Sequence, residues 1–158
     1  MADARFEDGG EKPLSLMATD REGLEVVSAL VQDAVFPVAE MTWDRTARRF
    51  ALLLNRFRWE DHEKAERVGR PFERVRTLLV FGDVMKVASQ GFTRGQGDLV
   101  LSLLSVTFTP GEDGTGRVDL TLAGDGAIAL DVECLDATLR DVTRPYIAPS
   151  GKAPRHGQ

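Results

Sequence analysis

The stretch from Gly116 to Leu135 constrains the fold most strongly, because its residues determine which side chains share a face. On both sides of Gly124-Asp125-Gly126, apolar residues alternate with polar or small ones, a pattern that predicts the two arms of a β-hairpin. A two-residue turn would put the apolar rows of the two arms on opposite faces. A three-residue loop from Gly124 to Gly126 instead sets Leu122 opposite Ile128, so that both rows meet one core.

The residues before position 34 predict a strand followed by a helix. Leu14 to Ala18 is a candidate short strand. Thr19 and Glu22 form a capping box, and apolar residues then recur at helical spacing, which predicts a helix from Asp20 to Asp33.

A longer strand is expected from Arg49 to Trp59. Both of its faces are apolar at the start but only one near the end, so we expect Arg56 and Arg58 to emerge into solvent. The charge-dense segment Glu60 to Arg70 has too few apolar residues to pack and predicts an exposed loop.

Glu73 to Phe92 predicts a second hairpin, with Gly82-Asp83 as a two-residue loop. Residues 99–104 fit either a strand or a short helix, and periodicity does not separate the two. Asp136 to Tyr146 forms an element of undetermined type. The order strand, loop and hairpin occurs twice, and we favour a chance product of an antiparallel meander over an internal repeat.

Together these elements predict an α+β fold. The expected architecture is an antiparallel meandering sheet or partly closed β-barrel of about seven or eight strands, with one N-terminal helix packed on it. A chain of 158 residues is long enough to bury a core without a disulfide or a metal. We expect residues 1–12 to be a loose leader, residues 13–146 to form a single domain, and residues 147–158 to be a disordered tail.

The expected compartment is the cytoplasm. The first residues are acids and glycines, where a signal peptide would have a basic end and an apolar run. No apolar stretch approaches the length needed to cross a membrane. The only cysteine, Cys134, lies on the inward row of the Gly116 hairpin, which predicts a small buried apolar side chain.

Basic residues gather in one block of a chain whose net charge is −5. Arg56, Arg58, Arg74 and Arg76 belong to it and are candidate binding residues. Nucleic acid is an unlikely partner on this pattern, because alternation places the aromatic side chains of the strand on the face opposite Arg56 and Arg58. Internal ion pairs with the acidic first 43 residues are the favoured interpretation.

A carboxylate cluster is the second candidate site. The three-residue loop sets Asp119 opposite Asp131 and Glu133 opposite Arg117. Like charges that face each other destabilise a sheet, so a divalent cation could be held by Asp119, Asp131 and Glu133. Screening by solvent or by Arg117 is the favoured interpretation, and no cofactor is therefore expected.

Sequence motifs of catalysis are missing. The glycine-rich segment Gly91 to Asp98 lacks the lysine of a phosphate-binding loop. His62 and His156 have no partners at ligand spacing, and no serine sits in a nucleophile elbow. These patterns neither exclude nor support an enzyme.

Several short motifs resemble those of an uncharacterised alphaproteobacterial family of short soluble proteins, catalogued as a domain of unknown function. The motifs are Pro13-Leu14-Ser15-Leu16 with Asp20 and Leu24, Phe50, Arg56-Phe57-Arg58-Trp59, Leu101-Ser102-Leu103-Leu104 with Phe108, and Gly124 to Leu135 with Asp141. The resemblance covers nearly all of residues 14–146. It implies a stand-alone bacterial cytoplasmic protein with no assigned reaction and no residue roles to transfer.

For function, the sequence favours a non-catalytic protein-binding or scaffolding module that works through a protein partner or through self-association, because apolar strands offer surface but no reactive cluster. A small-molecule or metal-dependent enzyme or ligand binder, using the carboxylate cluster, is the first alternative. A weak nucleic-acid binder, using the arginine block, is the second.

Overall fold

Eleven strands and two α-helices make up the described part of the chain, residues 12–147 and Pro154, in a computed structural model. The strands are β1 (Ser15–Ala18), β2 (Val35–Pro37), β3 (Met41–Asp44), β4 (Arg49–Phe57), β5 (Glu73–Phe81), β6 (Val84–Gln90), β7 (Val100–Pro110), β8 (Gly116–Leu122), β9 (Ala127–Val132), β10 (Ala137–Asp141) and β11 (Tyr146–Ile147). The helices are α2 (Arg21–Leu30) and α3 (His62–Val68), and four 3₁₀ helices are η2 (Val38–Glu40), η3 (Trp59–Asp61), η4 (Glu112–Gly114) and η5 (Ala123–Asp125).

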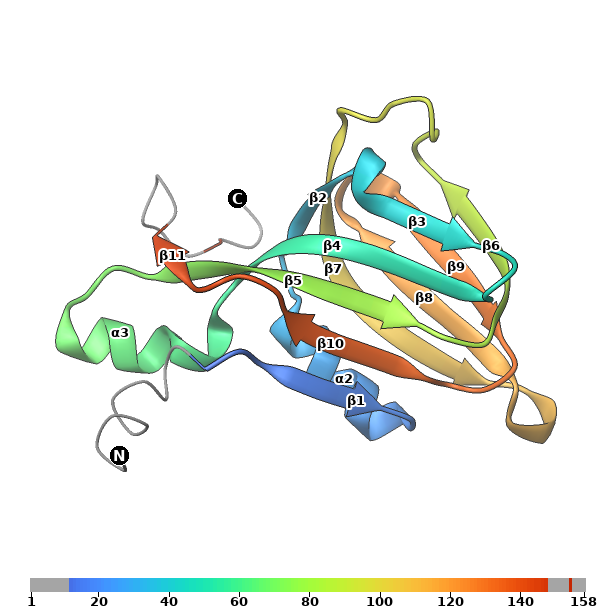
Figure 1. Ribbon diagram of the computed structural model, residues 1–158, viewed down its shortest axis with the longest axis horizontal. Helices are drawn as coiled ribbons and strands as arrows, with labels where there is room; N and C mark the ends of the chain where they lie inside the picture. The colour runs from blue at the N-terminus through green and yellow to red at the C-terminus, as the bar shows by residue number, and fades with distance from the viewer. Residues whose placement is uncertain (1–11, 148–153, 155–158) are drawn as a thin grey trace.

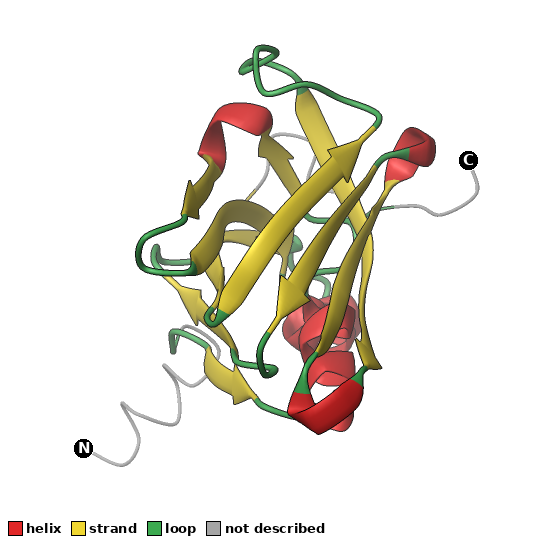
Figure 2. Cartoon of the chain, turned by 90° about the vertical axis from the view of Figure 1, so that its right-hand side faces the viewer, coloured by secondary structure: helices red, strands yellow, loops and turns green. Residues whose placement is uncertain are grey.

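All strands belong to one antiparallel sheet whose two halves face each other across the core (Figures 1 and 2). The strand order is β1-β10-β5-β4-β2-β7-β8-β9-β6, with β3 on β4 and β11 on β5. Short β2 joins the halves, since it pairs with both β4 and β7. The predicted antiparallel sheet is confirmed. The predicted strand and helix numbers are too low, and the sheet is open rather than a closed barrel, because its end strands β1 and β6 do not pair.

The core lies between the two halves of the sheet and α2. Val106 on β7 and Val118 on β8 are buried inside one half, while Leu52 and Leu79 on β4 and β5 are buried inside the other. Helix α2 buries Leu24 and Val27, and its Ser28 hydroxyl accepts a hydrogen bond from the Val106 N–H at 2.9 Å. The helix is therefore fixed against β7.

The β8–β9 hairpin keeps the predicted common face but not the predicted register. Leu122 and Ile128 are both buried in the core, as expected. The loop, however, is Ala123–Asp125, closed by a hydrogen bond from the Leu122 N–H to the Gly126 carbonyl at 2.9 Å. Consequently Leu120, not Leu122, faces Ile128. The reason is that Asp125 itself adopts a positive φ of 69°, next to Gly124 at 76°, so Gly126 is not needed in the loop.

The predicted hairpin from Glu73 to Phe92 is wrong. Its two strands do not pair, because β5 pairs with β4 and β10 whereas β6 pairs with β9. Gly82 and Asp83 carry the chain from one half of the sheet to the other. Backbone hydrogen bonds to other segments hold this crossing: Gly82 N–H to the Asp136 carbonyl, Val84 N–H to the Arg48 carbonyl, and Glu133 N–H to the Asp83 carbonyl.

Helix α2 is shorter than predicted, although the strand before it is confirmed. Its N-cap is Asp20 rather than Thr19, with the Asp20 carboxylate accepting from the Gly23 N–H at 2.7 Å. The helix ends at Leu30, and Asp33 adopts a positive φ of 63° with its N–H donating to the Leu103 carbonyl. This contact draws the chain into β2.

The segment from Glu60 to Arg70 is not the exposed loop that its charge predicts. It forms the end of η3 and α3, and Ala65 is fully buried. Rings outside the helix anchor its start: the ring of His62, the first residue of α3, stacks on Phe72 with centroids 4.9 Å apart and lies 5.8 Å from the ring of Phe57. Aromatic packing supplies the apolar contact that the helix itself lacks.

The structure assigns the two segments whose type the sequence left undetermined. Residues 100–104 are the first part of the long strand β7, which has an irregularity between Leu103 and Ser105. The segment from Asp136 to Tyr146 holds β10 and the start of β11. The predicted leader (1–12) and tail (147–158) fall, apart from Lys12, Ile147 and Pro154, outside the described residues. Within the described part, no helix is long and apolar enough to cross a membrane.

Candidate functional site

The predicted carboxylate cluster does not form, because it depended on the wrong register. Asp119 faces Ala129, and Asp131 faces Arg117. Arg117 donates to Asp119 at 2.9 Å, while Glu133 forms an ion pair with Arg48 at 2.6 Å. Asp119, Asp131 and Glu133 therefore have different surroundings, and the described residues contain no group of three or more side chains placed to hold a metal ion.

Arg56 lies at the centre of a buried ion-pair network, opposite to its predicted exposure. Its side chain is fully buried, and its two terminal nitrogens donate to the two carboxylate oxygens of Glu60, each at 2.8 Å. Asp141 accepts from Arg56 at 3.0 and 3.1 Å, and from the Thr77 hydroxyl at 2.7 Å. The Leu14 N–H donates to Asp141 as well. Both carboxylates are thus occupied.

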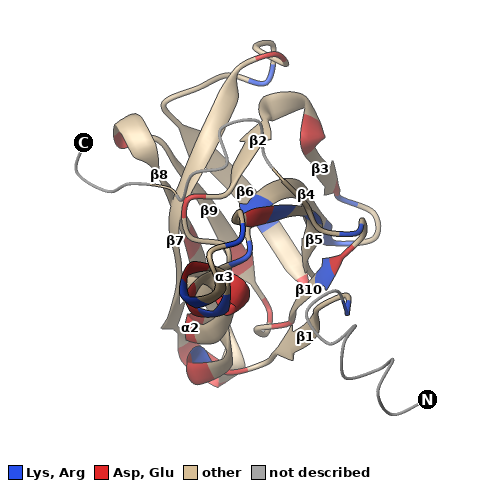
Figure 3. Ribbon diagram, turned by 90° about the vertical axis from the view of Figure 1, so that its left-hand side faces the viewer, with Lys and Arg blue, Asp and Glu red and all other residues tan. Residues whose placement is uncertain are grey.

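Arg58 and Arg70 extend this network towards α3. Arg58, also predicted to be exposed, is buried and contacts Glu73 at 2.6 Å. Arg70 contacts Asp61 at 2.6 Å and Glu73 at 3.5 Å. Figure 3 shows basic and acidic positions intermixed around α3. Asp61 and Glu73 lie near these arginines in the sequence, whereas Arg76 of the same basic block pairs with Glu40, one of the acids of the first 43 residues, at 3.9 Å.

The network raises the pKa of Arg56 and lowers the pKa of Glu60. Burial acts to lower the pKa of Arg56, but the hydrogen bonds and charges of Glu60 and Asp141 outweigh it, so this pKa is raised. For Glu60, burial acts to raise the pKa, but the Arg56 contacts outweigh it and the pKa is lowered. The charged forms of Arg56 and Glu60 are therefore both stabilised. Such groups hold the structure together and are poor proton donors or acceptors.

Arg74 and Arg76 lie on the outer face of the sheet, away from Arg56 and Arg58. Arg74 donates to the Asn55 side chain at 2.7 Å, and that amide donates to the Tyr146 hydroxyl at 2.6 Å. Burial lowers the pKa of Arg74. Arg76 is 46% exposed and lies 3.9 Å from Glu40. A groove of about 250 Å³ runs beside Arg76, Asn55 and Tyr146. Binding by Arg74 and Arg76 stays a prediction.

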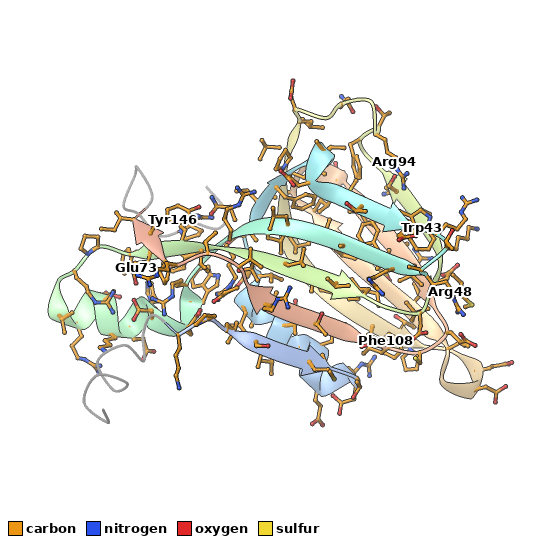
Figure 4. All side chains as sticks on the ribbon, viewed as in Figure 1. Trp43, Arg48, Glu73, Arg94, Phe108 and Tyr146 are labelled. Carbon is orange, nitrogen blue, oxygen red and sulfur yellow. The ribbon has the colours of Figure 1, made fainter. Side chains whose placement is uncertain are left out.

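A much larger groove lies at the opposite end of the sheet, and we call it the open-end groove. Its volume is about 870 Å³. Figure 4 shows Phe108 at this end and Tyr146 and Glu73 at the other. The groove is lined by Met17, Thr19, Asp20, Arg21, Asp83, Phe108, Pro110, Gly114, Thr115, Cys134, Leu135 and Asp136. It exists because four segments converge there without covering one another: residues 17–21 from β1 to α2, the β5–β6 crossing at Asp83, the β7–β8 turn, and the link between β9 and β10.

Phe108 forms an apolar wall of the open-end groove. It lies opposite Val118 in the β7–β8 ladder. A Cβ atom on Gly116 would overlap the Phe108 ring, so glycine at this position leaves room for the ring to lie over the β8 backbone. Met17, from the other half of the sheet, is 71% exposed and faces the same groove.

The polar lining of the open-end groove is mainly acidic. Cys134, predicted to point inward, is exposed because strand alternation ends with β9 at Val132. Its thiol donates to the Asp83 carboxylate at 3.1 Å. This hydrogen bond, together with desolvation and nearby negative charge, raises the pKa of Cys134. The thiol therefore stays protonated near neutral pH and is a poor nucleophile, so the groove suits binding better than attack on a substrate.

Reasoning from the sequence did not find the open-end groove. Its walls come from segments far apart in the chain, and each looks like an ordinary turn or strand end. One local signal was available: an aromatic residue and a glycine, Phe108 and Gly116, flank the Pro110 turn and are diagonal neighbours in the β7–β8 ladder.

The chain belongs to a family of proteins of unknown function (DUF2948), whose model matches residues 14–156. This confirms the resemblance to an uncharacterised family. No curated protein and no solved structure matches the chain.

Proposed function

We propose, taking membership of this family of unknown function as the premise, that the protein is a non-catalytic binding module that holds a segment of a partner protein in the open-end groove. The observation that supports the proposal is the exposure of apolar side chains where four segments converge. Met17 is 71% exposed and Pro110 is exposed, Phe108 is half-buried, and Leu135 is a buried residue at the base of the groove. Contiguous exposed apolar surface rimmed by polar residues is typical of protein interaction sites.

A protein segment fits this groove better than a small molecule. Small-molecule sites enclose most of the ligand surface and are usually about 300–1,000 Å³ in volume. The open-end groove reaches that volume, but Met17 on its wall stands in solvent and would leave a small ligand uncovered. An extended or helical segment can cover such a wall along its own length.

Photo-cross-linking from Cys134 tests the proposal. Cys134 is the only cysteine of the chain and lines the groove, so benzophenone-maleimide can be attached there in the purified protein before it is added to an extract of the native host. We expect one defined cross-linked partner, which disappears when Met17→Lys places a charge on the apolar wall.

A matched probe at a remote site provides the control. Cys134→Ser with Glu63→Cys moves the same photoprobe to the exposed surface of α3. Cross-linking of the same partner with equal yield from both positions, or no defined partner from Cys134, would contradict the proposed function.

A further inference from the structure

The acids of the open-end groove greatly outnumber its bases. Asp20, Asp83 and Asp136 line it, and Arg21 is its one basic lining residue. A neighbouring groove of about 330 Å³ shares Arg21 and Phe108 with it and adds Glu25. The turn η4, whose Gly114 also lines the open-end groove, adds two more carboxylates, Glu112 and Asp113.

These carboxylates lack the arginine partners that acids have elsewhere in the molecule. In the part of the chain that the structure describes, the salt bridges do not use Asp20, Asp83 or Asp136. The Asp20 carboxylate accepts a hydrogen bond from a backbone N–H at the start of α2, and the Asp83 carboxylate accepts one from the thiol of Cys134. Their negative charge is therefore not neutralised, in contrast to Glu60 and Asp141 beside Arg56.

From this charge we infer that the segment bound in the open-end groove is cationic and amphipathic: apolar side chains pack against Met17 and Phe108, while lysine or arginine side chains contact Asp83 and Asp136. The inference rests on the proposed function and names the chemistry of its partner. Complementary charge at the rim of an interface mainly sets specificity and association rate. An acidic partner segment is repelled by the same carboxylates.

Fluorescence polarisation with three synthetic peptides tests the inference. The probe is a fluorescein-labelled peptide that repeats Leu-Lys-Lys-Leu, and the matched peptides replace every lysine with glutamine or with glutamate. We expect only the lysine peptide to bind well. Its affinity should fall as salt is raised, because exposed charges are screened within about 10 Å at 0.1 M ionic strength.

Asp83→Asn with Asp136→Asn removes two groove charges with little change of shape. Asparagine tolerates the positive φ of 53° at position 83. The double variant loses the ion pairs that Asp83 and Asp136 would make with the lysine peptide. At the usual strength of exposed ion pairs, this loss should weaken binding of the peptide roughly five- to twentyfold. The matched control, Glu63→Gln with Asp98→Asn, removes two exposed charges far from the groove, and its affinity should stay within about twofold of the unmodified protein.

Each contrary result has a distinct meaning. Equal weakening by the groove and control variants shows attraction by net charge alone and overturns the inference. Tight binding of the glutamine peptide that is lost in Met17→Lys keeps the groove as a docking site but shows that the partner need not be cationic. If no peptide binds while photo-cross-linking stays specific to Cys134, the inference is wrong and the proposed function stands. Self-association that disappears when Cys134 is alkylated assigns the groove to a second copy and overturns the inference.

Discussion

The inner face of β4, β5 and β10 is filled in two different ways along its length. At one end, Phe50 lies opposite Phe81, and the next row, Leu52, Leu79 and Leu139, is also fully buried. At the other end, the rows continue with Thr77 and Asp141 and then with Arg56, on the same face of the same strands. Burial at each end is therefore set by what covers the strands, not by the strands alone.

The two ends should respond differently to mutation. A buried apolar side chain can be truncated, and the loss of folding free energy then depends on the volume of the cavity left behind. A buried ion pair loses more when one partner is removed, because the remaining charge stays buried without compensation. The comparison predicts that the charged end is the less tolerant of the two.

Arg56→Met is expected to have the largest effect. It leaves Asp141 and Glu60 without their arginine and should lower the free energy of unfolding by about 3–5 kcal/mol, measured by urea denaturation. Arg49→Met, on an exposed position of the same strand, is the control and should stay within about 0.5 kcal/mol of the unmodified protein. A loss below about 1 kcal/mol for Arg56→Met would mean that the network contributes little.

Leu79→Ala, at the apolar end, should cost about 2–5 kcal/mol in the same measurement. Leu79 is fully buried between β4 and β10. The volume-conserving change Leu79→Met should cost less than about 1.5 kcal/mol. If Leu79→Met proved as damaging as Leu79→Ala, the apolar end would be as intolerant as the charged end, and the comparison would fail.

The charged end should also make stability depend on pH. The pKa of Glu60 is lowered in the folded protein, so its stabilisation is present above the ordinary carboxylate pKa and is lost as pH falls through the lowered value. Urea midpoints measured between about pH 7 and about pH 3 should therefore decline at the acidic end. Glu60→Gln should flatten this decline, whereas Leu79→Ala should shift the curve without changing its slope.

The smallest expected effect concerns Cys134, whose neighbour is a carboxylate rather than an arginine. Its pKa is raised through the hydrogen bond to Asp83, so alkylation by iodoacetamide should be slow at neutral pH and should accelerate only at alkaline pH. Asp83→Asn should move the midpoint of this pH profile to lower pH. An unchanged midpoint would show that Asp83 does not control the thiol.

Alternation along the sequence predicts the face of each strand residue well, as at Leu122 and Ile128, because the period of a strand is two. It does not predict pairing partners. The Gly82-Asp83 pair resembles a hairpin turn locally, but the partners of β5 and β6 lie in distant segments. The predicted register of the β8–β9 hairpin is also wrong by two residues, because Asp125 adopts the left-handed conformation that the prediction assigns to a glycine.

The surroundings of charged residues were the hardest to predict. Alternation predicts Arg56 in solvent, because only one face of β4 stays apolar near the end of the strand. The segment after the strand helps to cover it nonetheless, through the carboxylate of Glu60, which pairs with Arg56. The open-end groove was missed for a related reason: it is formed where four distant segments meet, and no single stretch contains it.

The position of β1 at the edge of the sheet has a consequence during synthesis. β1 pairs with β10, and the Leu14 N–H reaches Asp141, 127 positions further along the chain. β1 must therefore wait for its partner until the strands from β2 to β9 have been made. Until then its unpaired backbone edge is open to other strands, including those of neighbouring nascent chains.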